Sequence, residues 1–127
     1  MIFGVTAEKV IGRINKLIDE LGQYDLRIQK YEQEADLALR AGFAGIGEDL
    51  EIQEWRAAHD EFYLILVDAR TGIKEGTLNY IEINKQLSSM KKAIRNFKRV
   101  LDQTDHSRGK ALAAARKRNG LYNAKNQ

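Results

Sequence analysis

Apolar residues recur at alternating steps of four and three through the first third of the chain, and no other feature of the sequence constrains the fold as strongly. The stretch from Val10 to Ala38 keeps this spacing for about four heptad repeats. It gathers the apolar side chains on one face of an α-helix, and another helix must cover that face in water. The positions are Val10, Ile14, Leu17, Leu21, Tyr24, Ile28, Tyr31, Ala35 and Ala38. We therefore predict one long amphipathic helix over about residues 6–41.

Capping residues mark both ends of this predicted helix. Thr6 can cap the first turn, with Val5 and Val10 at the two positions of a hydrophobic staple. Gly42 can adopt the left-handed conformation that often ends a helix, and Phe43 follows as the apolar residue that commonly folds back. The first helix is therefore bounded by local signals as well as by its row of apolar residues at heptad spacing, which we call its seam.

Two more seams with the same spacing follow a glycine-rich link at residues 42–47. They predict a second helix over about residues 47–71 and a third over about residues 77–103, with Gly72 and Gly76 as stop and start signals. The two seams comprise Ile52, Trp55, His59, Phe62, Leu66 and Ala69, and then Tyr80, Ile83, Leu87, Met90, Ile94, Phe97 and Leu101. The predicted fold class is all-α: an antiparallel three-helix bundle, or a long coiled-coil-like helical hairpin plus a third helix.

Two other arrangements are compatible with the middle of the chain. The seam spacing stays in phase through Ile73 and Gly76, which would allow the second and third helices to form one rod. Residues 62–67 and 78–83 are rich in aromatic and β-branched residues around a glycine-containing turn, which is compatible with a β-hairpin. Residues 62–67 are also apolar without exception, so a helix there needs the centre of a bundle or a subunit interface to cover it.

The seam weakens after Leu101, and a basic C-terminal arm is predicted beyond it. Residues 104–109 have the character of a polar link, whereas residues 110–119 are alanine-rich and have high helix propensity. We expect a helical bundle over residues 1–104, followed by a basic arm over residues 105–127 that contains a short helix or a tail.

Charge is divided unevenly along the chain. Residues 1–84 contain 9 Lys and Arg against 16 Asp and Glu, whereas residues 85–127 contain 12 Lys and Arg against 2 Asp and Glu. Cations of this density can neutralise the phosphates or carboxylates of a partner, or they can pair with the chain's own acidic helices or a neighbouring subunit. The expected contact residues are Lys91, Lys92, Arg95, Lys98, Arg99, Arg108, Lys110, Arg116, Lys117 and Arg118.

The sequence contains no recognisable catalytic motif. It has no cysteine, which excludes disulfides, thiolate catalysis and Cys-ligated metal sites. Di-iron helical bundles need two Glu-x-x-His pairs, but Arg56 and Gln103 stand three residues before His59 and His106. Asp102 and His106 would supply only two metal ligands from one helix face. We expect no enzyme activity, no cofactor, no metal and no small-molecule substrate.

His59 is the most conspicuous polar residue, because it occupies a seam position between aromatic neighbours. We expect it to be buried and paired with a carboxylate such as that of Asp60; the alternative is a pH-sensitive packing element. Aromatic side chains on the seams either build the core or line an oligomer interface. The residues assigned to the core or oligomer seam are Tyr24, Tyr31, Trp55, His59 and Phe62.

These observations favour a non-enzymatic helical assembly or adaptor protein, oligomeric, whose basic arm docks on an acidic partner. The alternative is a nucleic-acid-binding protein, a regulator or packaging factor, in which residues 85–127 contact the phosphate backbone. No helix-turn-helix, RNA-recognition or zinc-finger motif accompanies these cations. A third hypothesis, an inhibitor that mimics nucleic acid with an acidic face, is weaker because cations such as Arg13, Lys16 and Lys30 interrupt that face.

The sequence also carries no membrane signal. No segment is apolar over the roughly 18 residues that a membrane-spanning helix needs. The first residues are too short an apolar run, without a cationic flank, to resemble a secretion signal. We expect a soluble cytoplasmic protein that makes no membrane contact.

Overall fold

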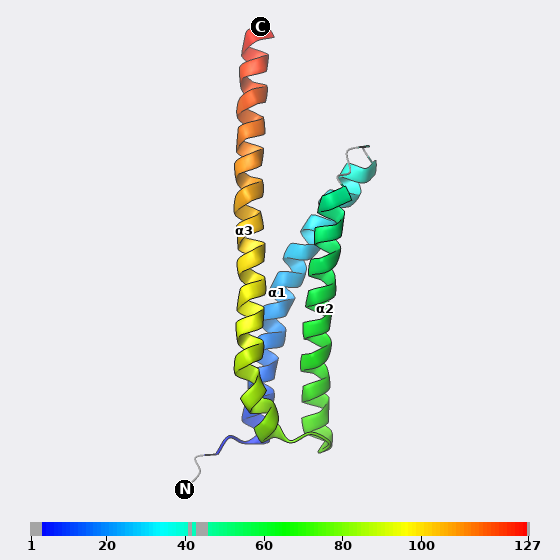
Figure 1. Cartoon of the computed structure of the whole chain (residues 1–127), viewed down its shortest axis with the longest axis vertical. Helices are drawn as coiled ribbons and strands as arrows, with labels where there is room; N and C mark the ends of the chain where they lie inside the picture. Colours follow the sequence, from blue (N-terminus) through cyan, green and yellow to red (C-terminus); the bar gives the residue numbers. More distant parts are fainter. Residues whose placement is uncertain (1–3, 41, 43–45, 127) are drawn as a thin grey trace. The chain divides into compact units, whose positions relative to one another are not determined.

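The protein is built from three long helices. The computed structural model describes the backbone of residues 4–40, 42 and 46–126, and the side chains of residues 4–37, 39–40, 42 and 50–107. The helices are α1 (Ala7–Arg40), α2 (Ile46–Glu75) and α3 (Tyr80–Asn126) (Figure 1). These residues contain no strand, so the all-α prediction is confirmed and the β-hairpin alternative is wrong.

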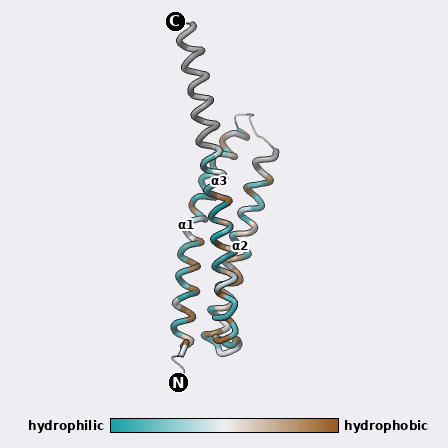
Figure 2. Tube along the Cα trace, turned by 60° about the vertical axis from the view of Figure 1, so that its left-hand side comes forward, coloured by the Kyte–Doolittle hydropathy of each residue, from teal (hydrophilic) through white to brown (hydrophobic). Residues whose placement is uncertain are grey.

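Helices α1 and α2 pack against each other as an antiparallel hairpin (Figure 1). The predicted seams make this contact: Val10, Ile14, Leu21 and Ile28 of α1 have no exposed surface, and Leu66 of α2 is 1% exposed. Figure 2 shows how apolar and polar residues alternate along both helices. Each such side chain stabilises the fold by about 1.5–3 kcal/mol relative to leaving it in water. The periodic spacing therefore determines which faces of the two helices meet.

Both ends of α1 carry the caps that the sequence predicts. The Thr6 hydroxyl oxygen accepts a hydrogen bond of 3.2 Å from the backbone N–H of Lys9. Gly42 has the left-handed φ of 80°, and its N–H donates to the Leu39 carbonyl at 3.0 Å. The observed helix begins and ends within one residue of the prediction. The expected fold-back of Phe43 lies outside the described residues.

The end of α2 differs from the prediction. The helix continues to Glu75, and Gly76 rather than Gly72 takes the left-handed conformation, with φ of 76°. Gly72 is helical, and Leu78 packs onto it so closely that a Cβ atom at this glycine would lie 2.3 Å from the Leu78 Cδ1. The Gly72 carbonyl accepts backbone hydrogen bonds from Thr77 at 2.9 Å and from Leu78 at 3.1 Å. This turn rules out one continuous rod from α2 into α3.

Helix α3 begins at Tyr80, three residues after the predicted start, and Asn79 caps its first turn. The Asn79 side-chain oxygen accepts a hydrogen bond of 2.9 Å from the backbone N–H of Ile81, which satisfies a donor that the first helical turn leaves unpaired. The Asn79 carbonyl accepts a further hydrogen bond from the N–H of Ile83 at 3.1 Å. A side-chain cap therefore replaces the glycine start signal that the sequence suggested.

The predicted end of the third helix near residue 103 is wrong. Helix α3 continues through residues 104–109, which we expected to form a polar link, and ends at Asn126. Thr104 fits within the helix by donating its hydroxyl to the Val100 carbonyl at 3.0 Å. Since the chain contains no proline and an isolated helical glycine costs only about 1 kcal/mol, the local sequence does not stop the helix.

The chain forms two compact units, residues 1–92 and residues 93–127, and the boundary between them falls within α3. In the first unit, Leu87 of α3 is buried. In the second, Ile94 and Leu101 have no exposed surface, as the predicted seam requires. Across the described residues, no helix combines the length and the hydropathy needed to cross a lipid bilayer.

The all-apolar stretch of α2 is only partly covered by the chain itself. Leu66 is buried and Phe62 is half-buried, but Tyr63, Leu64 and Ile65 are 43%, 58% and 46% exposed. The expectation that this stretch lies at the centre of a bundle, covered on several sides, is therefore wrong. The alternative, that a subunit interface covers this stretch, stays a prediction.

Candidate functional site

The most closely paired charges lie inside the α1–α2 hairpin. The guanidinium of Arg56 on α2 bridges two carboxylates of α1: it donates to Asp25, and its Nη2 lies 2.6 Å from Oε1 of Glu32. The hydrogen bond from Arg56 holds the pKa of Asp25 below its ordinary value. The hydrogen bond to Glu32 raises the pKa of Arg56 above its ordinary value. Arg56 thus stabilises the charged form of Asp25, and its ion pairs with Asp25 and Glu32 join the two helices.

His59 lies buried on the α2 seam, and its Nδ1 is 2.9 Å from the Asp60 carboxylate. Its ring stacks on that of Tyr63, with the ring centroids 6.3 Å apart. The expectation of a buried histidine beside a carboxylate is confirmed. The other aromatic residues of the predicted set are buried or half-buried within the first unit: Tyr24, Tyr31, Trp55 and Phe62. These side chains form core, and the rings of Tyr31 and Trp55 meet across the hairpin with centroids 5.4 Å apart.

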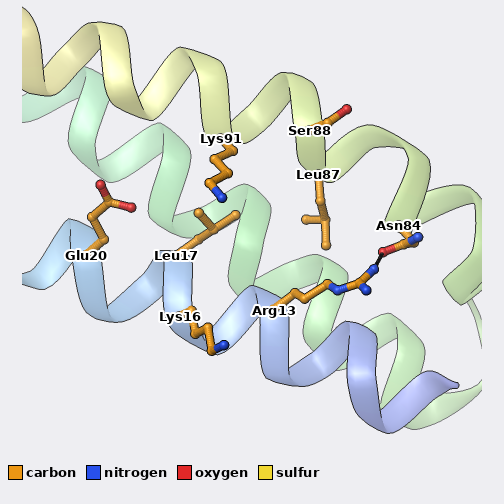
Figure 3. A pocket seen from close by; sticks show the side chains of 8 residues that line it. All are labelled: Arg13, Lys16, Leu17, Glu20, Asn84, Leu87, Ser88 and Lys91. Carbon is orange, nitrogen blue, oxygen red and sulfur yellow. Dashed lines mark hydrogen bonds between the residues drawn. The ribbon is translucent and has the colours of Figure 1, made fainter. Parts of the chain in front are cut away.

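A cationic groove lies between α1 and the first turns of α3, and we call it the α1–α3 groove (Figure 3). Its volume is about 660 Å³. It is lined by Arg13, Lys16, Leu17, Glu20, Asn84, Leu87, Ser88 and Lys91. Figure 3 shows Leu17 and Leu87 entering the space between the helices from opposite sides, while Arg13 donates a hydrogen bond to the Asn84 carboxamide oxygen. The groove therefore combines an apolar interior with a polar rim.

The electrostatics of the groove favour an anion. Three cationic side chains face one carboxylate, which leaves a net charge of +2. That carboxylate, Glu20, accepts a hydrogen bond of 2.6 Å from the Tyr24 hydroxyl. In the described part of the chain, neither Lys16 nor Lys91 pairs with a carboxylate. Both ammonium groups are therefore available to an external acidic group.

Most cations on the described part of α3 are exposed and unpaired, and they include every predicted contact residue whose side chain the structure describes. Lys85 lies 3.5 Å from Glu82, one turn earlier on the same helix, and both side chains are more than 60% exposed. Within the described residues of their own unit, five other cations form no ion pair: Lys91 and Lys92 in the first unit, and Arg95, Lys98 and Arg99 in the second. The alternative that the third helix pairs its cations with α1 and α2 is therefore not observed for Lys91 and Lys92.

The remaining predicted contact residues belong to α3, at positions beyond the described side chains. They are Arg108, Lys110, Arg116, Lys117 and Arg118. Asp102 and His106, which the sequence singled out as a pair, are exposed on α3. Among the described residues, no group of three or more His, Asp or Glu side chains is placed to hold a metal ion.

The exposed side of α2 has the opposite charge, and we call it the α2 outer face. It consists of Glu54, Ala57, Glu61, Leu64, Ile65 and Asp68. Glu61 and Asp68 lie within one helical turn of Leu64 and Ile65 on either side, so the apolar pair is flanked by carboxylates. Over the residues that the structure describes, Glu54, Glu61 and Asp68 form no ion pair.

Sequence reasoning missed part of this arrangement. It treated Arg13 and Lys16 only as interruptions of an acidic face, although each stands one residue before a buried seam position, Ile14 or Leu17. Residues that flank a seam rim the contact with the next helix, so their place in the heptad could have indicated a groove. It also gave Arg56 no structural role, although that residue directly follows a seam tryptophan.

The chain is not recognisable by similarity. No family model matches it, and comparisons with curated proteins and with solved structures likewise give no match. The geometry of these surfaces is therefore the basis for a functional proposal.

Proposed function

We propose that this protein is a non-catalytic helical assembly or adaptor protein, which self-associates through α2 and holds an acidic partner with the cations of α3. The observation that carries the proposal is the run of exposed apolar side chains at Tyr63, Leu64 and Ile65, on a helix whose seam side is packed into a hairpin. Single exposed apolar residues are ordinary, whereas apolar surface gathered in one exposed segment commonly marks a contact site, and we call this run the apolar patch of α2.

The patch lies on a helix whose opposite side is fixed by the seam. Leu66 is buried next to Ile65, so the exposed side chains cannot turn inwards without breaking the hairpin core. The unpaired cations of α3 supply a second surface, of opposite charge to the carboxylates around the patch. Two surfaces of opposite charge suit a protein whose role is to bring chains together.

The self-association is tested by replacing Leu64 with Glu and measuring molar mass by size-exclusion chromatography with light scattering at tens of micromolar. The wild-type chain should exceed the mass of a monomer, and the variant should shift towards it. Leu26→Glu is the matched control, because Leu26 is 66% exposed on α1 but lies outside the patch, and it should leave the mass unchanged. A wild-type chain that is strictly monomeric would refute self-association.

Nucleic acid is the second candidate partner, and the observation that favours it is the set of unpaired cations on α3. Phosphate contacts release counterions, so binding should weaken steeply with salt. A gel-shift assay with duplex DNA and with RNA compares the wild type with a full-length variant in which Lys91, Lys92, Arg95, Lys98 and Arg99 are replaced by Gln. Removing one cation that binds a phosphate should reduce the salt slope for DNA by about 0.9. Equally poor binding by both proteins at low salt excludes this candidate.

A further inference from the structure

We propose that the α2 outer face of one copy docks in the α1–α3 groove of a second copy. This inference rests on the proposed self-association and names the two surfaces that carry it. Both surfaces belong to the compact unit of residues 1–92, so neither depends on the rest of the chain.

Charge complementarity indicates that the α2 outer face of a second copy occupies the α1–α3 groove. The groove presents Lys16 and Lys91 without a carboxylate partner, and Glu20 is engaged by a tyrosine hydroxyl. The α2 outer face presents Glu61 and Asp68, likewise unpaired. Contact between two α2 outer faces would set carboxylates against carboxylates, which opposes association. Contact between the face and the groove instead pairs each free carboxylate with a free cation.

The shape of the two surfaces also agrees. The groove runs from Arg13 to Glu20 on α1 and from Asn84 to Lys91 on α3, and the part of the α2 outer face around its apolar pair runs from Glu61 to Asp68. Each of these segments advances about 10 Å along its helix at 1.5 Å per residue. Leu64 and Ile65 stand midway along this part of the face, so docking would place them against the apolar interior of the groove. A hollow of about 660 Å³ has room for two such aliphatic side chains.

The contact has a consequence for symmetry. The face and the groove are different surfaces, so docking either occurs twice about a two-fold axis, with each copy giving its face to the other's groove, or repeats from copy to copy. Every copy offers both surfaces, and repeated docking either closes into a ring or extends as a chain. Association should therefore increase as concentration rises.

Two full-length variants with reversed charge test the proposal. The groove variant carries Lys16→Glu and Lys91→Glu, and the face variant carries Glu61→Lys and Asp68→Lys. Sedimentation velocity at low salt should show association weakened by about 100-fold in each variant alone, because each now sets like charges against each other. An equal mixture should associate again, since both of its cross-contacts join opposite charges. Circular dichroism should show unchanged helix content, because all four side chains are exposed.

The matched control is Lys9→Glu with Lys30→Glu, which makes the same change of charge on exposed α1 residues outside the groove and should leave assembly intact. Assembly of the wild type that neither charge variant weakens, or a mixture that stays dispersed, overturns this interface but leaves the proposed self-association standing. A wild-type chain that never assembles overturns both. Weakening in each variant with recovery in the mixture supports the docking of face into groove.

Discussion

Arg56 of the α1–α2 hairpin and Lys91 of α3 are both cations beside a contact between helices, but they are used differently. Arg56 is 25% exposed and bridges the carboxylates of Asp25 and Glu32 from the neighbouring helix. Lys91 is exposed on the rim of the α1–α3 groove and pairs with no carboxylate in the described part of the chain. The first cation contributes to the fold. The second leaves its charge available to another molecule.

The difference shows that net charge along a sequence does not indicate whether charges act inside a fold or outside it. Both helices of the hairpin carry cations among carboxylates, and one arginine that reaches across the helix contact pairs with two of those carboxylates. Helix α3 carries cations in excess, and five of them form no ion pair with the described residues of their own unit: Lys91, Lys92, Arg95, Lys98 and Arg99. Substitutions in the two regions should therefore affect different properties: stability in the hairpin and association in α3.

The largest expected effect is on the hairpin core. Leu66→Ala removes a side chain that is 1% exposed, and we expect a loss of about 3 kcal/mol in the free energy of unfolding because a cavity forms at the seam. Urea denaturation followed by circular dichroism measures it. Val100→Ala on α3, where the side chain is 43% exposed, is the control and should change stability by less than about 0.5 kcal/mol. Similar losses in the two variants would contradict the distinction between the regions.

A smaller effect is expected from removing the bridging cation. Arg56→Met keeps much of the apolar stem but leaves two carboxylates without their partner, and it should cost about 1–2 kcal/mol, discounted because the cluster is partly exposed. Lys92→Met is the matched change on α3 and should fall within about 0.5 kcal/mol of wild type. Thermal melts of both variants at neutral pH provide the comparison. Equal melting temperatures would show that the bridge contributes nothing.

The same bridge predicts a dependence of stability on pH. The pKa of Asp25 is lowered in the folded state by its hydrogen bond from Arg56. Its stabilising contribution is therefore fully present above the ordinary aspartate pKa of about 3.9 and is lost as the pH falls through the lower folded value. Unfolding free energies measured from pH 6 to pH 2, at about unit steps, should decline less steeply in Arg56→Met than in the wild type. If the unfolding free energies of the two proteins decline in parallel with pH, Asp25 is excluded as a source of that decline.

The smallest effects concern two glycines, one in the turn between α2 and α3 and one within α1. Gly76→Ala places a Cβ atom at a φ of 76° and should destabilise the chain by about 1 kcal/mol. Gly12→Ala in α1, where a Cβ atom would meet nothing within 4 Å, should instead stabilise it by about 0.5–1 kcal/mol through helix propensity. Chemical denaturation of both variants distinguishes the expected loss of stability in Gly76→Ala from the expected gain in Gly12→Ala. A stabilising Gly76→Ala would show that the left-handed turn is not required.

The sequence predicted those parts of the fold that depend on local periodicity and capping. The seam from Val10 to Tyr31, the Thr6 cap and the Gly42 turn follow from short-range rules, and the structure confirms each of them. The end of α2 could not be predicted from such rules, because Gly72 and Gly76 carry the same stop signal. Only the packing of Leu78 onto Gly72 distinguishes between them.

The candidate site was less accessible to sequence reasoning, because it depends on which helix faces lie side by side. Lys91 was predicted as a contact residue from its charge alone, but its position opposite Lys16 becomes visible only when α1 and α3 are placed together. The role of Arg56 has the same origin, since its two partners precede it by 24 and 31 residues. In contrast, the pairing of His59 with a neighbour in sequence could be predicted.

The most direct test of the account is a sedimentation-equilibrium series on the unaltered chain, over a range of concentrations at low and at high salt. Docking of the α2 outer face in the α1–α3 groove predicts an average mass that rises with concentration beyond that of one chain and falls as salt screens the charged rim of each contact. A mass equal to that of one chain at every concentration and at both salt levels would contradict it.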